Sequence, residues 1–320
     1  MTSKLVAEAK QIREIWAGYW KARVFLTANN FQVFDQLTNE RTAAAVAKKT
    51  GADLRAMTIL LDALAGIGII KKTEGKYRNT PAADKFLTRN GPYYQGDIIR
   101  HADVSWQNWS GLDEVLKTGK PHRAARNHES FILGMHNLSV LKAADVLKAV
   151  GLKGVKTALD LGGGPATYAV EMAKAGVAAT VLDRPETAAI ALDVIKKSGV
   201  KGINFIQGDF LLDDLGGGYD LVFISQILHS FPKADNIKIL KKARKALNKG
   251  GRVAIQEFFI DDSLASPEDG ALFSVNMLVN TEDGRCYAFK EINAWLAAAG
   301  FKKIMQKKLF DSSLITAETE

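Results

Sequence analysis

The chain has 320 residues, of which 47% are apolar, and a formal net charge of +8 at pH 7. This length predicts two domains, and the apolar content is sufficient for a core in each. No apolar run is long enough to cross a bilayer, and the early charged residues Lys4, Glu8 and Lys10 do not fit a secretory signal peptide. We therefore expect a cytoplasmic protein that does not act in a membrane.

The cysteine content and the charge distribution narrow the function classes further. The single cysteine, Cys286, excludes an internal disulfide framework and a metal site built from several cysteines, and we expect no bound metal. The excess positive charge lies entirely in residues 1–150, which hold 22 Lys and Arg against 14 Asp and Glu. Such a charge could serve an anionic substrate or a nucleic acid. A solvated basic surface is the simpler interpretation, and we favour it.

The first part of the chain is predicted to be helical. Residues 11–40 form helices with aromatic anchors, and further helices follow at Thr42–Lys49 and Leu54–Leu64. Thr42 is a suitable N-cap, and Gly51 comes just after the end of that helix. Residues 68–78 carry a hairpin pattern with a central Glu-Gly pair. The order helix, helix, hairpin is typical of a winged helix.

A winged helix often binds DNA through its second helix, here Leu54–Leu64. A helix that reads the major groove needs a face of hydrogen-bonding side chains, and the polar residues of this segment are only Arg55, Thr58 and Asp62. Its other positions are apolar, as in a helix buried in a core or a subunit interface. We therefore favour a dimerisation module over a nucleic-acid-binding regulator, and we expect a homodimer.

Residues 81–150 are predicted to be mostly helical, with a last helix over about Ser130–Val150. This segment contains Trp106 and Trp109 and is placed to form one wall of a substrate pocket. The expected organisation is a dimerisation domain at 1–100, a helical linker at 101–150 and an α/β domain at 151–320.

The most informative stretch is Thr157–Ala169, TALDLGGGPATYA. An apolar run typical of a buried parallel strand ends in three glycines, Gly162 to Gly164, and a helix-forming segment follows. Glycines here allow a tight turn and a close approach of the backbone to a ligand. Asp160 precedes them, and its charge favours a cationic group, such as the amino or sulfonium group of S-adenosylmethionine, over a pyrophosphate.

The second predicted strand of this domain, Ala178–Leu182, ends in Asp183, which lies 21 residues after Gly162. A carboxylate at this place can accept hydrogen bonds from both ribose hydroxyls. The interpretation that competes with this one is a simple helix N-cap or turn residue.

The third and fourth strands end in the same way. A strand over 203–206 precedes Asp209 and Phe210, which suit an adenine amino group and ring face, and the strand Asp220–Ser225 leads to His229. Open α/β sheets bind ligands at the carboxyl ends of their strands. Three successive strands after the triple glycine are followed by polar groups. This repetition favours a site for a nucleoside-containing cofactor over the interpretation that each polar residue is a separate helix N-cap or turn residue.

The remaining elements complete an α/β pattern. Helices are predicted at Pro232–Asn248, Pro267–Val279 and Phe289–Ala299, a turn at 249–251, and strands at Arg252–Phe259, Lys302–Leu309 and Leu314–Ala317.

Together these segments resemble the class I S-adenosylmethionine-dependent small-molecule O-methyltransferases with an N-terminal winged-helix dimerisation domain. The resemblance covers residues 15 to 317 and is carried by LLDALAGIGIIKKTEGKYRNTPAADKFL, LDLGGGPATYA, VLDRPET, QGDF, SQILHSF, ALNKGGRVAIQE and NMLVNTEDGRCYAFKEINAWLAAAGF. It implies a Rossmann-like domain with a mostly parallel seven-stranded sheet. It also implies methylation of a hydroxyl on a small aromatic or polyketide-like molecule, with S-adenosylmethionine as the cofactor.

The resemblance assigns cofactor contacts to matching positions. The methionine part of the cofactor would lie on the glycine loop, the ribose on the second strand, and the adenine after the third strand. The residues implied are Gly162, Gly163, Gly164, Asp183, Asp209, Phe210 and Ser225, and the charge argument given above adds Asp160.

The resemblance also assigns the chemistry. His229 would be the general base and Glu257 the carboxylate that orients it, because an imidazole can take the proton of a phenol as its oxygen attacks. The sulfonium methyl is already activated, so the protein mainly supplies alignment and desolvation. Met135, Asn276 and Met277 fall where the family lines its acceptor pocket. Trp106, from the helical segment that could form one wall, is a fourth candidate. Without the resemblance, a structural role for His229 would be the preferred interpretation.

Two positions depart from the family pattern. Arg184 follows the ribose-binding carboxylate where many relatives have a leucine, and Cys286 stands where the family often has a second carboxylate beside the base. Glu282 and Asp283 are nearby substitutes, although neither is in register. We expect Cys286 to be a small packed residue.

Three alternatives follow from these observations. The missing carboxylate leaves open a C-methyltransferase or a relative that binds the cofactor without transferring methyl. A winged-helix nucleic-acid-binding regulator is the second. The third, an NAD-dependent oxidoreductase, is disfavoured by Asp160 and by Thr167, which stands where the dinucleotide pattern requires a glycine.

Overall fold

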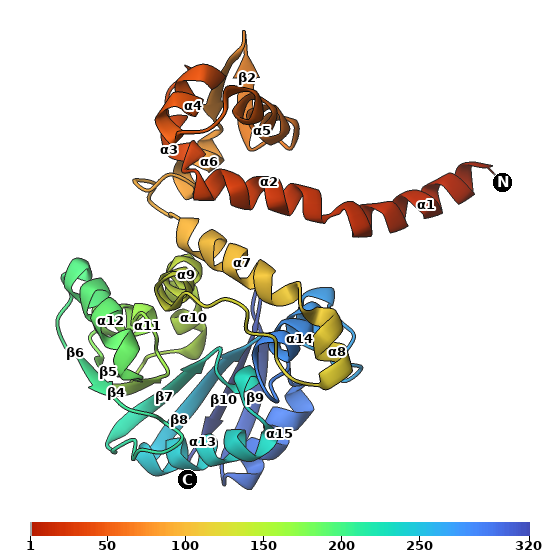
Figure 1. Ribbon diagram of the computed structural model, residues 1–320. Helices are drawn as coiled ribbons and strands as arrows, with labels where there is room; N and C mark the ends of the chain where they lie inside the picture. The colour runs from red at the N-terminus through yellow and green to blue at the C-terminus, as the bar shows by residue number, and fades with distance from the viewer. Residues whose placement is uncertain (1) are drawn as a thin grey trace. The chain divides into compact units, whose positions relative to one another are not determined.

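The computed structural model describes residues 2–320 and divides into two compact units, one ending at Asp103 and one beginning at Val104 (Figure 1). The first unit is mainly helical. Its elements are α1 (Thr2–Ala17), α2 (Tyr19–Asn30), α3 (Val33–Gln36), β1 (Arg41–Thr42), α4 (Ala43–Thr50), α5 (Leu54–Gly66), β2 (Ile70–Thr73), β3 (Lys76–Asn79) and α6 (Pro81–Phe86). Helix α7 (Gly96–Trp109) runs across the division.

The expected order of helix, helix and hairpin is present in α4, α5 and the β2–β3 pair. The Thr42 hydroxyl accepts a hydrogen bond from the amide of Ala45 at 3.3 Å, and Gly51 ends α4 in the left-handed conformation, as the sequence predicted. Strands β1, β3 and β2 form a small antiparallel sheet. The two-residue strand β1 was not predicted, since a segment this short cannot show the alternation of apolar and polar residues that marks a strand.

Helix α5 buries one face and exposes the other. Met57, Leu61 and Leu64 lie in the core of this unit. Asp62 lies on the outer face, and its carboxylate accepts hydrogen bonds from the Lys72 ammonium at 2.5 Å and the Tyr77 hydroxyl at 2.7 Å. These contacts fasten the hairpin to the helix.

The second unit is an α/β domain with further helices ahead of its sheet. Its helices are α8 (Leu112–Thr118), α9 (His128–Val140), α10 (Ala143–Val150), α11 (Thr167–Lys174), α12 (Pro185–Ser198), η1 (Leu228–Ser230), α13 (Lys233–Ala246), α14 (Glu268–Asn280) and α15 (Phe289–Ala298). Its strands are β4 (Thr157–Leu161), β5 (Ala178–Asp183), β6 (Ile203–Gln207), β7 (Tyr219–Ser225), β8 (Leu247–Glu257), β9 (Lys302–Lys308) and β10 (Ser313–Glu318). Within residues 2–320 no helix is long and apolar enough to cross a membrane.

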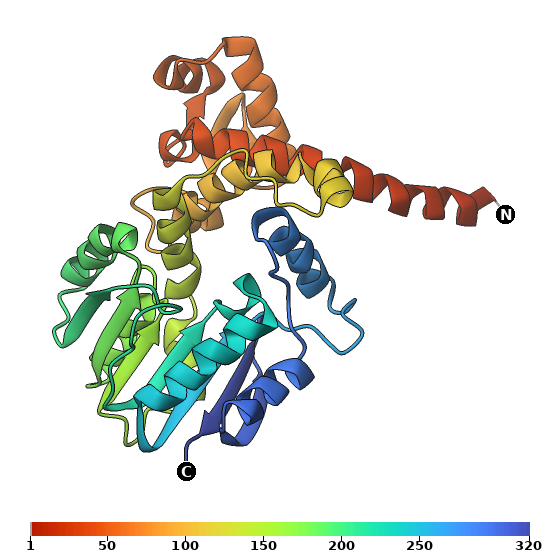
Figure 2. The same cartoon turned by 60° about the horizontal axis from the view of Figure 1, so that its bottom comes forward.

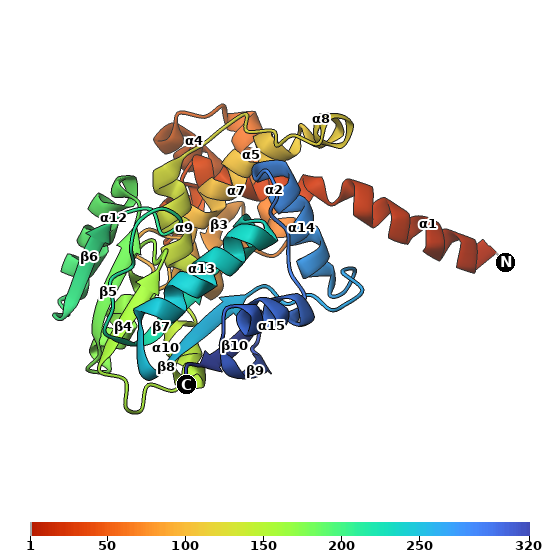
Figure 3. The same ribbon diagram turned by 90° about the horizontal axis from the view of Figure 1, so that it is seen from below.

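The strands form one sheet in the order β6-β5-β4-β7-β8-β10-β9, which can be followed across Figure 3. The first five are parallel, and β10 is antiparallel to both of its neighbours. This arrangement confirms the predicted Rossmann-like, mostly parallel, seven-stranded sheet. The order reverses between β4 and β7, where open α/β sheets hold ligands.

Two layers of helices cover the sheet. On one face α13 and α15 lie side by side (Figure 2) and bury Leu240 and Trp295 against strand residues such as Ile224. On the other face α10, α11 and α12 cover strand residues such as Phe223 and Ala254. The strands are buried on both sides, and for this reason their sequences are continuous apolar runs rather than alternating patterns.

Two predicted boundaries in this unit were wrong. The helix expected over Ser130–Val150 is two helices, α9 and α10, because the chain turns at Leu141 and Lys142. The turn expected at 249–251 lies inside β8, which begins at Leu247. Gly250 has φ +75° there, and the pairing of β7 with β8 shifts register nearby, so the strand passes through an irregularity instead of stopping.

Candidate active site

The three glycines after β4 are required by their surroundings. Gly162 and Gly164 have φ of +67° and +52°, a region that side chains disfavour. A Cβ on Gly163 would lie 2.6 Å from the carboxyl carbon of Asp160, and one on Gly162 would lie 2.5 Å from the Ile227 side chain. The loop thus brings its backbone against both β4 and the segment after β7.

Asp160 lies beneath this loop and is 1% exposed. Within residues 2–320 neither of its carboxylate oxygens has a hydrogen-bond partner. Burial raises its pKa to about 7, and the charge of Asp183 adds to this rise. The nearby amide of Ala169 lowers the pKa in part, although its geometry is not that of a normal hydrogen bond. A buried carboxylate without a partner fits a cationic ligand group, which would supply the missing charge and hydrogen bonds.

Asp183, at the end of β5, fixes the shape of the loop. One of its oxygens accepts a hydrogen bond from the amide of Gly164 at 2.7 Å, and the other accepts from the amide of Arg184 at 2.7 Å and from the Thr187 hydroxyl at 3.3 Å. The Arg184 side chain forms an exposed ion pair with Glu186. The departure from the family pattern at Arg184 therefore places a charge in solvent and leaves the carboxylate of Asp183 in position.

Asp209 and Phe210 follow β6. The Asp209 carboxylate accepts a hydrogen bond from the amide of Leu211 at 2.8 Å, which makes a tight turn. The Phe210 ring meets the Phe231 ring edge to face at 5.6 Å, and its edge comes within 3.4 Å of a Cβ built on Gly162. An apolar ring thus lies beside the glycine loop.

The segment after β7 carries His229 in the short helix η1. Its imidazole is 8% exposed and its Nδ1 lies 2.8 Å from one oxygen of Glu257. The other oxygen of Glu257 accepts a hydrogen bond from the amide of Leu228 at 2.7 Å. Because a carboxylate only accepts, Nδ1 carries a proton, and in the neutral imidazole Nε2 then presents a lone pair. This is the arrangement of a general base held by a carboxylate.

Two aromatic rings that the sequence did not single out surround this base. Phe273 meets the His229 imidazole edge to face at 5.0 Å, and Phe258 lies 5.8 Å from it. The two phenyl rings stack on each other at 3.7 Å. Their apolar spacing resembles that of any core helix or strand, so the sequence carries no signal for this role. They give the imidazole apolar surroundings.

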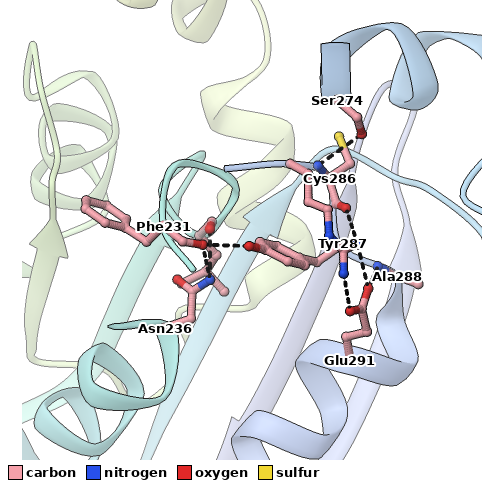
Figure 4. A network of polar contacts seen from close by, with 9 residues as sticks. Phe231, Asn236, Ser274, Cys286, Tyr287, Ala288 and Glu291 are labelled. Atoms are coloured by element: carbon pink, nitrogen blue, oxygen red, sulfur yellow. Dashed lines mark hydrogen bonds and ion pairs between the residues drawn. The ribbon is translucent and has the colours of Figure 1, made fainter. Parts of the chain in front are cut away.

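The backbone of the turn that carries His229 is held by side chains from two other elements (Figure 4). Asn236 on α13 donates to the carbonyls of Leu228 and Phe231, both at 2.9 Å. The Tyr287 hydroxyl donates to the same Phe231 carbonyl at 2.7 Å. Asn236 is fully buried, and sequence reasoning missed it because a single asparagine in a helix has no pattern.

Cys286 is 2% exposed and packs with Ala288, Phe258 and Phe273. Its amide donates to the Ser274 hydroxyl at 3.1 Å (Figure 4). Burial raises the pKa of its thiol to about 11, so it is a packed, unreactive group, as expected.

The nearby acidic residues do not replace the missing carboxylate. Glu282 is exposed and forms an ion pair with Arg123 at 3.2 Å, and Asp283 is exposed as well. Glu257 is therefore the one carboxylate within residues 2–320 that is hydrogen-bonded to His229.

The residues expected to line an acceptor pocket lie on three helices. Asn276 and Met277 are on α14, Met135 is on α9, and Trp106 is on α7. The side-chain oxygen (Oδ1) of Asn276 accepts hydrogen bonds from the Trp109 indole at 2.9 Å and from the side-chain NH₂ group of Asn280 at 3.1 Å. Both bonds fix the side chain so that its own NH₂ group remains available as a donor.

Comparisons with known proteins identify the family. A family model described as an O-methyltransferase domain matches residues 93–302, and one described as an O-methyltransferase dimerisation domain matches residues 14–89. The 3-hydroxy-5-methyl-1-naphthoate 3-O-methyltransferase of Streptomyces sahachiroi is 32% identical over 92% of this chain and 89% of that protein. The acetylserotonin O-methyltransferase of Gallus gallus is 27% identical over 93% of this chain and 94% of that protein.

Solved structures give the same picture. An O-methyltransferase family protein from Burkholderia thailandensis matches with a TM-score of 0.86 and 26% identity, over 98% of both chains. Human N-acetylserotonin methyltransferase in complex with S-adenosylmethionine matches with a TM-score of 0.89 and 24% identity, over 98% of this chain and 97% of that one, which shows a shared fold.

Proposed function

The chain belongs to the S-adenosylmethionine-dependent O-methyltransferase family, and from this premise we propose that it methylates a hydroxyl group on an aromatic or polyketide-like small molecule with His229 as the general base. The observation that carries the proposal is the buried His229–Glu257 pair, with Nδ1 and the carboxylate oxygen 2.8 Å apart. The relative with 32% identity is named for methylating a hydroxynaphthoate, which supports a hydroxylated aromatic ring as the acceptor.

The cofactor, when bound, supplies an activated methyl group on its sulfonium. The glycine loop over Asp160 would hold its amino acid end, with the buried carboxylate facing a cation. Asp183 would accept hydrogen bonds from the ribose, and Asp209 and Phe210 would contact the adenine. Ser225 would lie beside the reacting end. The unpartnered oxygens of Asp160 and the apolar ring beside the loop are the observations that support this placement.

The proton of the acceptor hydroxyl moves to His229. Nε2 would take the proton from the acceptor hydroxyl while that oxygen receives the activated methyl group of the bound cofactor. Glu257 keeps the imidazole in the correct tautomer and stabilises the imidazolium that forms. The stacked rings of Phe258 and Phe273 exclude water beside the base, which strengthens these charge interactions.

The acceptor would lie among α7 and α9, which precede the sheet in sequence, and α14, which comes between β8 and β9. Asn276 offers a donor from its fixed amide, and Met277 and Met135 offer flexible apolar surface that suits a planar ring. Trp106 lies in the segment 101–150, and we propose that this segment forms the helical wall of the pocket. In sequence the segment connects the dimerisation domain at 1–100 to the catalytic domain at 151–320.

We propose that the chain works as a homodimer through its N-terminal domain, which matches the dimerisation model. Helices α1 and α2 expose a series of large apolar side chains, each more than half exposed: Leu5, Val6, Ile12, Ile15, Trp16, Tyr19 and Trp20. A surface of this kind marks an interaction site. Light scattering at micromolar concentration is expected to give twice the mass of one chain, and the mass of a single chain would contradict the proposal.

The test is methyl transfer from isotopically labelled S-adenosylmethionine to matched sets of hydroxynaphthoates, phenols, anilines and carbon acids, with products identified by mass spectrometry. Aryl methyl ethers should form, and His229→Ala should reduce their formation by at least about a hundredfold, the usual contribution of a general base. Methylation at carbon or nitrogen that survives this substitution would overturn the proposal.

A further inference from the structure

A chain of buried hydrogen bonds runs from the turn between β9 and β10 to the end of β7. Gln256 on β8, which is fully buried, lies at its centre. Its carbonyl oxygen accepts from the Tyr168 hydroxyl at 2.6 Å and from the Ser225 hydroxyl at 3.0 Å. Its NH₂ group donates to the Ser312 hydroxyl at 3.1 Å, and Ser312 donates to the Asp311 carboxylate at 3.1 Å.

The Asp311 end of this series of hydrogen bonds determines which group donates and which accepts in each bond. The Asp311 carboxylate is paired with the Lys142 ammonium at 2.6 Å, so it is ionised and can only accept. Ser312 gives its one proton to Asp311 and must therefore accept from Gln256. The Gln256 amide then has only one orientation, with its NH₂ group toward Ser312 and its carbonyl oxygen toward the other two hydroxyls.

The fixed amide dictates what Ser225 can offer to a ligand. Its hydroxyl proton is directed inward to Gln256, so the oxygen presents only lone pairs to its remaining neighbours. Ser225 follows Phe223 on the same face of β7, and Phe223 is paired with Asp160 across the strands. The Tyr168 ring packs on Phe223 at 4.8 Å, and burial, with a smaller contribution from the charge of Asp160, raises the pKa of its hydroxyl to about 12. Ser225 and Asp160 thus share the face of β7 and β4 that carries Phe223, and both present acceptor oxygens there.

We propose that Gln256 is a positioning residue that makes this end of the cofactor site an acceptor of positive charge, so that the site favours the sulfonium cofactor over its neutral-sulfur product, S-adenosylhomocysteine. The inference rests on the cofactor placement of the proposed function. Without the Gln256 carbonyl, the Ser225 hydroxyl could turn its proton toward the cofactor. This proton would repel the positively charged sulfonium of S-adenosylmethionine, but it would be compatible with the neutral thioether sulfur of S-adenosylhomocysteine.

The test is calorimetric titration of the whole protein with each of the two ligands, which measures binding without turnover. Gln256→Met keeps the length of the side chain and removes the acceptor. The substitution should raise the ratio of the Kd for S-adenosylmethionine to the Kd for S-adenosylhomocysteine by about tenfold, so the preference for S-adenosylmethionine is weakened. This is the size of effect expected for one charge-assisted contact. Gln256→Glu keeps a carbonyl oxygen facing both hydroxyls, and the ratio should stay at or below that of the unmodified protein.

Two further variants separate the possible failures. Gln306→Met removes a comparable bond, from Gln306 to the Ser313 hydroxyl at 2.9 Å, at the neighbouring edge of the sheet, and it should leave the ratio unchanged. An equal loss of affinity for both ligands in Gln256→Met, or no change in either, would overturn the inference. If Ser225→Ala changes neither affinity, the placement of the cofactor in the proposed function is itself wrong.

Discussion

Replacing Asp160 with asparagine should stabilise the cofactor-free protein while weakening cofactor binding. The carboxylate is completely buried without a hydrogen-bond partner, and its pKa rises from 3.8 to about 7. At about 1.4 kcal/mol per pKa unit, this rise corresponds to about 4 kcal/mol of unfolding free energy lost when the group is ionised in the folded state. Asparagine fills the same volume without a charge, so it avoids this loss.

The sign of the effect depends on pH. Between the unfolded pKa of 3.8 and the folded value of about 7, the folded protein holds a proton on Asp160 that the unfolded chain has released. The stability of the cofactor-free protein therefore falls as pH rises through this window. Asp160→Asn should be more stable than the unmodified protein by up to about 4 kcal/mol at about pH 8, and the difference should vanish below about pH 4.

The assay is urea unfolding of both cofactor-free proteins across this pH range, together with calorimetric titration of S-adenosylmethionine. The variant should lose at least about tenfold in affinity for the cofactor at about pH 8, because the buried negative charge that attracts the cation is gone. A variant that is less stable than the unmodified protein at high pH, or a stability difference that does not change with pH, would refute the reasoning.

Three other substitutions test the surroundings of the base. Glu257→Gln keeps an acceptor for the amide of Leu228 but opposes the present tautomer of His229, so kcat should fall by at least about a hundredfold with little change in cofactor affinity; unchanged kcat would contradict this. Cys286→Ala should keep most of the methyl-transfer activity. In the unmodified folded protein the Cys286 thiol should resist alkylation at about pH 8, since its pKa is about 11. Rapid alkylation with loss of activity would instead indicate a chemical role for Cys286. Gly284→Ala would place a Cβ 2.4 Å from the His229 carbonyl oxygen, so steady-state kinetics should show a fall in kcat of more than about tenfold. A normal kcat would show that the backbone of the His229 turn can shift without loss of catalysis.

The elements of the sheet could be predicted because parallel strands and their ligand-binding ends leave local signals. The apolar run before Gly162 and the carboxylate at Asp183 both follow from sequence position alone, and the structure places them side by side through the hydrogen bond to Gly164. The strand that begins at Leu247 was placed wrongly because Lys249-Gly250-Gly251 has turn composition, while pairing with β7 carries the strand through it. Tertiary contacts decided that boundary.

The candidate base could be identified only through the family resemblance, since one histidine in a helix start has no chemical signature. Its surroundings were not predictable at all. Phe273 and Tyr287 lie far from His229 in sequence and meet its turn through folding. Asn236 is only seven residues away, but a single asparagine in the next helix gives no sign that it holds this turn. Gln256 was passed over for the same reason, because its importance lies in hydrogen bonds to residues from three other segments.

The central claim, that His229 removes the proton of an acceptor hydroxyl, is tested most directly by single-turnover rates on a series of phenols of graded acidity. The unmodified protein should methylate acidic and weakly acidic phenols at similar rates, because the base takes the proton during attack. His229→Gln should bind S-adenosylmethionine normally and retain activity only toward the most acidic phenols, with a rate that rises with pH. Equal rates for the variant and the unmodified protein on weakly acidic phenols would contradict the account.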